Sequence, residues 1–233
     1  MRSFWRTLDG TLLRDIALVC LAVGVIGVSY GAIAVASGFP WWFPVLMGAL
    51  VLAASSEFLF VGIIAAGGSP IAALLAGLLV NARHLPFGLA VSDVLGRGRR
   101  GALGTHLMND ETVVFTLAQD EPARRRAAYW ACGLGILVCW PVGAALGALL
   151  GSAVRDTGAL GLDAMFPAVI LALILPAMKE RSLPRSALAS AALALAATPF
   201  LPAGLPVLAA LAALPLFTVQ AKNTVGAKEG ATR

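Results

Sequence analysis

Residues 71–91 read IAALLAGLLVNARHLPFGLAV, an apolar block that Asn81, Arg83 and His84 interrupt. A charge at membrane depth costs ~2.5–3.5 kcal/mol or more, so an ionisable residue inside such a block marks a functional site by default. Pro86 disfavours helix at the residue before it and removes one backbone donor, which predicts a broken helix. A break at membrane depth is tolerated only where it is buried in protein or lines a cavity. The block therefore predicts a membrane fold and the position of its site.

The composition of the chain also favours a membrane protein. Hydrophobic residues make up 59% of the 233 residues and charged residues only 12%, and the mean hydropathy is +0.88. A soluble domain carries about 25% charged residues, so this chain lacks the polar surface that a soluble fold needs. The net charge of +5 does not indicate nucleic-acid binding, because the basic residues flank apolar spans rather than forming one face.

Five apolar regions predict an all-α, polytopic helical membrane protein. They are residues 16–36, 41–66, 71–91, 127–150 and 165–178, and an Ala- and Leu-rich stretch broken by prolines follows at 186–217. These regions do not alternate apolar and polar residues as barrel strands do. Gly143, Gly147 and Gly151 recur at every fourth residue, which predicts a close-packing helix face, either within the chain or against a partner.

The chain also resembles itself. Phe43–Glu57 aligns with Phe166–Glu180 without a gap, and seven positions are identical. Each unit follows a Gly-rich helix and precedes a Pro-broken Ala/Leu block, and internal duplication with broken helices is common in secondary transporters. We therefore expect two repeat halves, residues 1–126 and 127–233, with chance similarity between apolar segments as the alternative.

The basic residues predict the topology. Fifteen of the 17 Lys and Arg residues lie in four polar segments, which are Arg2–Arg14, Arg97–Arg126, Lys179–Arg185 and Lys222–Arg233. The positive-inside rule places all four, and both termini, on the cytoplasmic side of the plasma membrane. A full crossing by residues 71–91 would put the six arginines of Arg97–Arg126 outside. We therefore expect this block to be re-entrant, with two half-helices that meet near Arg83. The alternative is an external N-terminus with a full third span.

Arg83 is the first candidate site residue, because its planar guanidinium suits a carboxylate. Asn81, His84 and Ser56 are the polar neighbours that we expect beside it at the substrate site. Glu57, the other charge inside an apolar block, is predicted to carry a coupling proton or to neutralise Arg83. Of these two roles, the structural pair of Glu57 with Arg83 is favoured.

A second polar cluster lies in the Arg-rich connection and contains His106, Asn109, Asp110 and Glu111. We expect a solvated helix start, in which Asn109 or Asp110 is the cap and Glu111 lies in the first turn. A coupling or gating role for Asp110 and Glu111, and a metal site that uses His106, are the alternatives. The sequence contains no P-loop or other cofactor-binding or hydrolase motif, so no cofactor is expected. The same holds for a metal, since the three cysteines lack metal-ligand spacing.

Taken together, these residues resemble the AzlC family, the large subunit of a branched-chain amino acid export system. The resemblance covers most of the chain and rests on Ser29-Tyr30-Gly31, Ser55-Ser56-Glu57-Phe58, Asn81-Ala-Arg83-His84, Asp110-Glu111 and Phe166-Pro167. It implies a two-component exporter whose partner is the small hydrophobic AzlD protein. The family pattern has Gln where this chain has Glu57, and exchanging an amide for a carboxylate can change the substrate, the coupling ion or both.

Three functions follow from these observations. The leading one is a secondary transporter subunit that exports small, branched-chain amino acids. The second is an intramembrane enzyme acting on a lipid or peptide, with Arg83, His84 and Glu57 as acid, base and anchor, although no nucleophile is evident. The third is a membrane scaffold whose glycine faces bind partner helices, which leaves the buried charge and the helix break unexplained.

Overall fold

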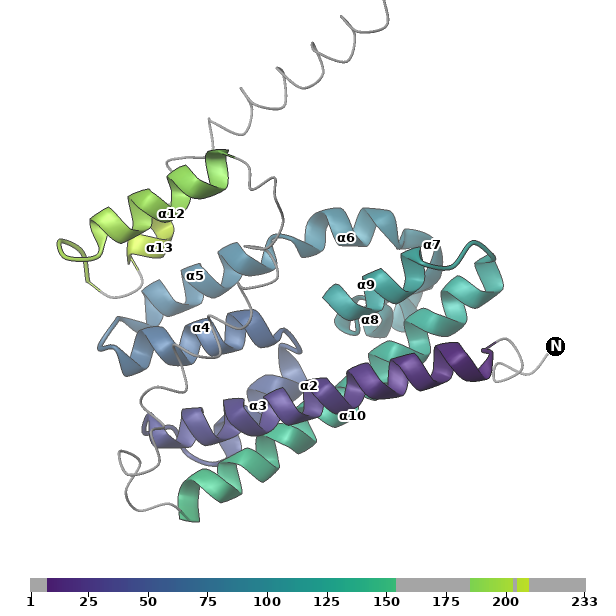
Figure 1. Cartoon of the computed structure of the whole chain (residues 1–233), viewed down its shortest axis with the longest axis horizontal. Coiled ribbons are helices and arrows are strands. Elements are labelled where there is room, and N and C mark those ends of the chain that lie inside the picture. The colour runs from purple at the N-terminus through teal and green to yellow at the C-terminus, as the bar shows by residue number, and fades with distance from the viewer. Residues whose placement is uncertain (1–7, 154–184, 203–204, 210–233) are drawn as a thin grey trace, which may run out of the picture. The chain divides into compact units, whose positions relative to one another are not determined.

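The computed structural model describes residues 8–153, 185–202 and 205–209, and each regular element in these ranges is a helix (Figure 1). The helices are α2 (Gly10–Ala36), α3 (Trp42–Leu50), α4 (Ala54–Ala65), α5 (Pro70–Asn81), α6 (His84–Ala90), α7 (Ser92–Leu95), α8 (Gly98–His106), α9 (Asp110–Leu117), α10 (Pro122–Ala153), α12 (Arg185–Ala197) and α13 (Leu205–Ala209). Within the described residues, Gly10–Ala36, Pro70–Ala90 and Pro122–Ser152 are long and apolar enough to cross a membrane. The chain is therefore an all-α, polytopic membrane protein, as its composition predicted.

The chain divides into two compact units. Of the described residues, the first unit holds 8–58 and 80–153, and the second holds 59–79, 185–202 and 205–209. In the second unit, Ile63 of α4 packs with Ala73 and Ala76 of α5, and Ser69 Oγ caps α5 by accepting from the Ala72 N–H at 3.1 Å. The later segment of the predicted repeat, Phe166–Glu180, lies outside the described residues, so the repeat and its two halves remain predictions.

Helices α2 and α10 form the frame of the first unit, and they lie side by side in Figure 1. A Cβ on Gly143 would collide with the backbone oxygen of Gly24, and one on Gly147 with that of Val28. The facing residue numbers rise together along both helices, so α2 and α10 run parallel. The glycine face predicted in α10 is therefore a packing face within the chain, where backbones approach more closely than any side chain allows.

The N-terminal ends of these two helices are tied together. Asp9 caps α2 by accepting from the Leu12 N–H at 2.8 Å, and it also accepts from Arg124 Nη2 of α10 at 2.7 Å. The cap bond and the Arg124 guanidinium lower the pKa of the Asp9 carboxyl. Both helices therefore begin at the same end of the first unit.

The predicted span of residues 41–66 is broken into α3 and α4, a break that the sequence did not reveal. Leu52 adopts a φ of 52°, and it is the only described residue other than glycine with positive φ. Such a conformation is costly for a leucine, and strain of this kind clusters at functional sites. By contrast, the break predicted between Asn81 and Pro86 is present, because α5 ends at Asn81 and α6 begins at His84. Whether Pro70–Ala90 is re-entrant remains a prediction.

Helix α9 packs on α10, and α8 touches α10 where Tyr129 Oη donates to the Gly104 oxygen at 2.7 Å. Gly133 of α10 leaves room for Leu107 and Thr112 in the α8–α9 tip, which is residues 107–112. The sequence predicted a solvated helix start in this segment, with Asn109 or Asp110 as the cap. That prediction was wrong for the tip, where Leu107, Met108, Asn109 and Thr112 are buried. The physical reason is that the absent side chain of Gly133 lets the tip dock on α10.

Candidate functional site

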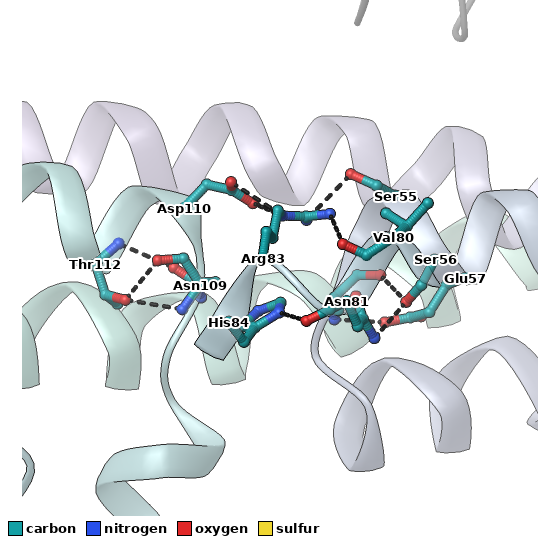
Figure 2. Close-up of polar contacts among 11 residues, drawn as sticks. Ser55, Ser56, Glu57, Val80, Asn81, Arg83, His84, Asn109, Asp110 and Thr112 are labelled. Carbon is teal, nitrogen blue, oxygen red and sulfur yellow. Dashed lines mark hydrogen bonds and ion pairs between the residues drawn. The ribbon is translucent and has the colours of Figure 1, made fainter. Parts of the chain in front are cut away.

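Several helix ends of the first unit meet around Arg83. Figure 2 shows the start of α4, the end of α5, the start of α6 and the start of α9 converging on its side chain. Nearby in the sequence, His106 Nε2 at the end of α8 lies 2.9 Å from the Ala49 oxygen of α3. Helix ends carry backbone N–H and C=O groups without intrahelical partners. The site therefore combines backbone groups that lack partners within their own helices with a permanent cation.

Arg83 forms a bidentate ion pair with Asp110. Its Nε lies 3.1 Å from both carboxylate oxygens, and its Nη2 lies 2.8 Å from Oδ2. The remaining donors contact the Val80 oxygen at 3.1 Å and Ser55 Oγ at 3.4 Å. The two charged side chains are 26% and 50% exposed, so neither is sealed inside the protein. A ligand can therefore compete for both charges.

The predicted pairing of Arg83 with Glu57 was wrong. Glu57 is 1% exposed, and its carboxylate accepts from the Ala53 N–H at 3.0 Å and from Trp140 Nε1 at 3.2 Å. The unpredicted break before α4 frees the Ala53 N–H, and a carboxylate near a helix N-terminus binds such a donor. Glu57 therefore turns toward its own helix end and α10 rather than toward Arg83.

An aromatic cluster surrounds the Glu57 carboxyl. Tyr30 stacks on Trp140 with ring centroids 5.3 Å apart, and Phe58 packs edge-on against Tyr30 at 5.3 Å. The Tyr30 hydroxyl is buried beside the carboxyl without a well-formed hydrogen bond. Within the described part of the chain, no Lys, Arg or His forms an ion pair with Glu57. The carboxyl thus sits among rings and two neutral donors.

The other predicted residues form a short chain of hydrogen bonds at the break. Asn81 Nδ2 donates to Ser56 Oγ at 3.0 Å, and Ser56 Oγ donates to the Ala53 oxygen at 2.9 Å. His84 Nδ1 lies 2.9 Å from the Asn81 oxygen at the end of α5. Asn81 Oδ1 is buried and has no hydrogen-bond partner in the described structure. The structure therefore brings Arg83, Asn81, His84 and Ser56 together, and leaves one acceptor available.

The start of α9 is capped as the sequence predicted. Asn109 Oδ1 accepts from the Thr112 N–H, Thr112 Oγ1 accepts from the Asn109 N–H, both at 2.9 Å, and Asp110 and Glu111 occupy the first turn. Burial and the adjacent Asp110 charge raise the pKa of Glu111, against the opposing effect of Arg83. Within the described residues no group of three His, Cys, Asp or Glu side chains is placed to hold a metal.

Three residues of this region were missed by the sequence reasoning. Ser55 contacts Arg83, while Trp140 and Tyr30 enclose Glu57. The polar run Ser55-Ser56-Glu57 was a usable signal for Ser55. Tyr30 belongs to the Ser29-Tyr30-Gly31 motif of the family resemblance, which gave it no role at the site. Trp140 lies in a long apolar helix, where an aromatic residue is ordinary, so nothing in the sequence pointed to it.

Comparison with known proteins gives a consistent result. Residues 18–154 match the family model described as AzlC protein. The Branched-chain amino acid transport protein AzlC of Bacillus subtilis (strain 168) is 29% identical over 160 residues, covering 67% of this chain and 63% of that protein. An uncharacterized membrane protein of Haemophilus influenzae (strain ATCC 51907 / DSM 11121 / KW20 / Rd) is 31% identical over 131 residues, covering 54% of each chain. The match thus spans less than two thirds of either relative, and no solved structure matches.

Proposed function

Because the chain belongs to the AzlC family, we propose that it is the large subunit of a secondary transporter that exports small, branched-chain amino acids across the plasma membrane. The printed name of the Bacillus subtilis relative supports the substrate class. The breaks between α3 and α4 and between α5 and α6 support the mechanism, since secondary transporters typically bind substrates at broken helices.

The observation that carries this proposal is Arg83, held at converging helix ends and still 26% exposed. A guanidinium binds a carboxylate through two parallel hydrogen bonds, which fixes the orientation of an amino acid as well as its charge. Asn81, Ser56 and His84 line the same break and supply polar contacts. Leucine or valine would place its carboxylate on Arg83 and its side chain against apolar helix surface.

Glu57, Asp110 and Glu111 are the candidates for coupling and gating. Glu57 lacks an ion-pair partner in the described part of the chain, and carboxyl groups of this kind mark proton relays in pumps and transporters. Asp110 and Glu111 begin α9 beside Arg83, so a change in their contacts would reach the substrate site directly.

A small hydrophobic subunit of the AzlD type is the proposed partner, and both termini are proposed to be cytoplasmic. Large apolar side chains of the two frame helices face outward, among them Leu21 and Val25 of α2 and Val138 and Leu146 of α10. Such faces suit lipid or a second membrane subunit. The Arg-rich Arg97–Arg126 segment favours the cytoplasm for the end at which α2 and α10 begin.

The test is efflux of radiolabelled leucine from liposomes that contain the full chain with its small partner. We expect Arg83→Lys to fold and to transport roughly tenfold or more slowly, because Lys keeps the charge but loses the planar fork. Arg125→Lys is the matched control. Arg125 lies on α10 and pairs with Asp93, and this variant should transport normally. Full transport by Arg83→Lys would refute the carboxylate clamp, and turnover of added lipid or peptide without leucine efflux would indicate the intramembrane enzyme instead.

A further inference from the structure

We propose that Asp110 binds the ammonium group of the substrate, so that a zwitterionic amino acid opens the Arg83–Asp110 ion pair and each residue takes one of its charges. This inference rests on the proposed function and assigns a second half to the same site. It predicts that the transporter selects molecules carrying both an α-carboxylate and an α-ammonium group.

Asp110 occupies the position that a substrate carboxylate needs. Its oxygens already receive Nε and Nη2 of Arg83, the edge of the guanidinium that grips carboxylates side-on. The Nη1 donor is used by the Val80 oxygen, and Nη2 also contacts Ser55. A substrate carboxylate can bind Arg83 with full geometry only if Asp110 gives way.

Displacing Asp110 from Arg83 leaves a negative charge that needs a new partner. Once displaced, Asp110 is a carboxylate without its cation, beside the partly buried Glu111 at the start of α9. An uncompensated charge in a partly desolvated site is costly, whereas a bound ammonium would compensate it. The zwitterion therefore replaces one ion pair with two, and the net charge of the site is unchanged.

Asp110 can separate from Arg83 without loss of α9. The cap of α9 is made by Asn109 and Thr112, which are buried and bonded to each other rather than to Arg83. The Asp110 side chain is half exposed. Rotation of this one side chain can open the pair while the helix start stays in place.

Ligand series on the full chain with its partner in lipid nanodiscs test the inference. The probes are leucine, 4-methylpentanoate, which lacks the ammonium group, and 3-methylbutylamine, which lacks the carboxylate. For the wild type we expect leucine to bind roughly tenfold to a hundredfold more tightly than either analogue, because each analogue leaves one charge unpaired.

The Asp110→Asn variant gives the sharper result. It should bind 4-methylpentanoate more tightly than the wild type does, because no carboxylate competes for Arg83, and its preference for leucine should fall to about threefold or less. Asp93→Asn removes the acid of the Arg125 ion pair and should keep the wild-type preference. Asp110→Glu retains the charge and should keep much of that preference.

The outcomes separate the two proposals. If Asp110→Asn keeps the wild-type preference, the ammonium role is overturned while leucine binding still supports the transporter. If Asp110→Asn does not fold, the wild-type series decides, and equal binding of leucine and 4-methylpentanoate overturns the role. If the wild-type complex binds no leucine, the proposed function fails and this inference fails with it.

Discussion

Glu57 shows how a single carboxyl can be accommodated inside an apolar helix without an opposite charge. Its two hydrogen bonds come from the Ala53 N–H and from Trp140 Nε1, and each of these donors is itself buried. The donors need an acceptor as much as the carboxyl needs donors, because a buried N–H left unpaired costs about 1–3 kcal/mol.

We therefore expect Glu57→Gln and Glu57→Leu to differ strongly in stability. Gln presents an oxygen to both donors without a charge, so its thermal unfolding midpoint in detergent should equal or exceed that of the wild type. Leu fills similar space but leaves both donors without an acceptor. It should lower the free energy of unfolding by about 2 kcal/mol or more. Equal midpoints for the two variants would show that these hydrogen bonds contribute little.

Glu111 provides a pH-dependent prediction at the same scale. Its pKa is raised in the fold, so the folded state favours the protonated acid. The contribution of this shift to the free energy of unfolding is fully present below the pKa of the unfolded state, about 4.3. It is lost as the pH rises through the pKa of the folded state. Glu111→Gln should therefore raise the unfolding midpoint at pH 7–8, and the gain should shrink as the pH falls toward about 4.

Asp93 is the control, because its pKa is shifted in the opposite direction. Its hydrogen bond to Arg125 lowers its pKa, so its stabilisation is present above about pH 4 and is lost as the pH falls. Asp93→Asn should lower stability at neutral pH by only about 0.2–1 kcal/mol, since the pair is exposed. If the stability change caused by each variant has the same pH dependence, the opposite directions assigned to the two pKa shifts are contradicted.

At this scale the sequence located Arg83 but not its partner. A charge inside an apolar run stands out from its surroundings, which is why Arg83 was predictable. Asp110 lies 27 positions later in a segment rich in Arg, where an acid is expected to be solvated. Only the docking of the α8–α9 tip on Gly133 brings that acid to the site, and one glycine in a Gly-rich helix carries no such signal.

At the scale of the elements, the two helix breaks differ in how visible they were. Polar residues and Pro86 predict the break between α5 and α6. The break between α3 and α4 falls in Leu50-Val-Leu-Ala-Ala54, which contains neither Gly nor Pro. There Leu52 is left-handed, and Glu57, which accepts from Trp140, also accepts from the N–H of the next residue, Ala53. Tertiary contacts can override local propensity.

The α2–α10 contact yields a prediction about glycine. Gly147→Ala places a Cβ against the backbone oxygen of Val28. Because the obstacle is backbone, no flexible side chain can move aside to make room for it. The helices would have to separate, and overpacking of this kind typically costs about 1–3 kcal/mol. We expect a lower yield of monodisperse protein and a lower unfolding midpoint, both measured by fluorescence-detected size-exclusion chromatography.

Gly10→Ala is the matched control for that experiment. Gly10 is the first residue of α2, and an added Cβ there meets nothing within 4 Å. Alanine also favours helix over glycine by about 1 kcal/mol in a helix interior. If Gly147→Ala behaves like Gly10→Ala, the close α2–α10 contact is not needed for the fold.

For the whole molecule, the parallel arrangement of α2 and α10 restricts the topology. Two helices that cross the membrane in the same direction must be separated by an odd number of crossings. If α2 and α10 both cross, residues 37–121 therefore make an odd number of crossings. Helices α7, α8 and α9 each have fewer than the ~20 residues that a span needs. The predicted re-entrant block 71–91, with a single crossing by 41–66, would meet this requirement, and it remains a prediction.

Cysteine labelling of intact cells tests this topology. In a variant without Cys20, Cys132 and Cys139, an impermeant thiol reagent should label Ser37→Cys, after α2, from outside. Arg99→Cys should be labelled only after the membrane is permeabilised, because the positive-inside rule places the Arg-rich segment in the cytoplasm. Labelling of Arg99→Cys in intact cells would exclude the proposed orientation.

The fold class was predictable from the sequence because hydropathy alone requires helices in lipid. The parallel pairing of α2 with α10 was not, since a glycine spacing shows that a face packs closely and says nothing about its partner. The packing of Gly143 and Gly147 on α2 became visible only in the structure.

That pairing also has a consequence for how the protein is made. The segment of α10 that receives α2 is synthesised roughly 120 residues after it, which is about 6–24 s at 5–20 residues per second. During that interval α2 has left the ribosome with its glycine-rich surface uncovered. Nascent chains of this protein should therefore depend on insertion chaperones until α10 emerges, and chains arrested before residue 122 should be preferred targets of membrane proteases.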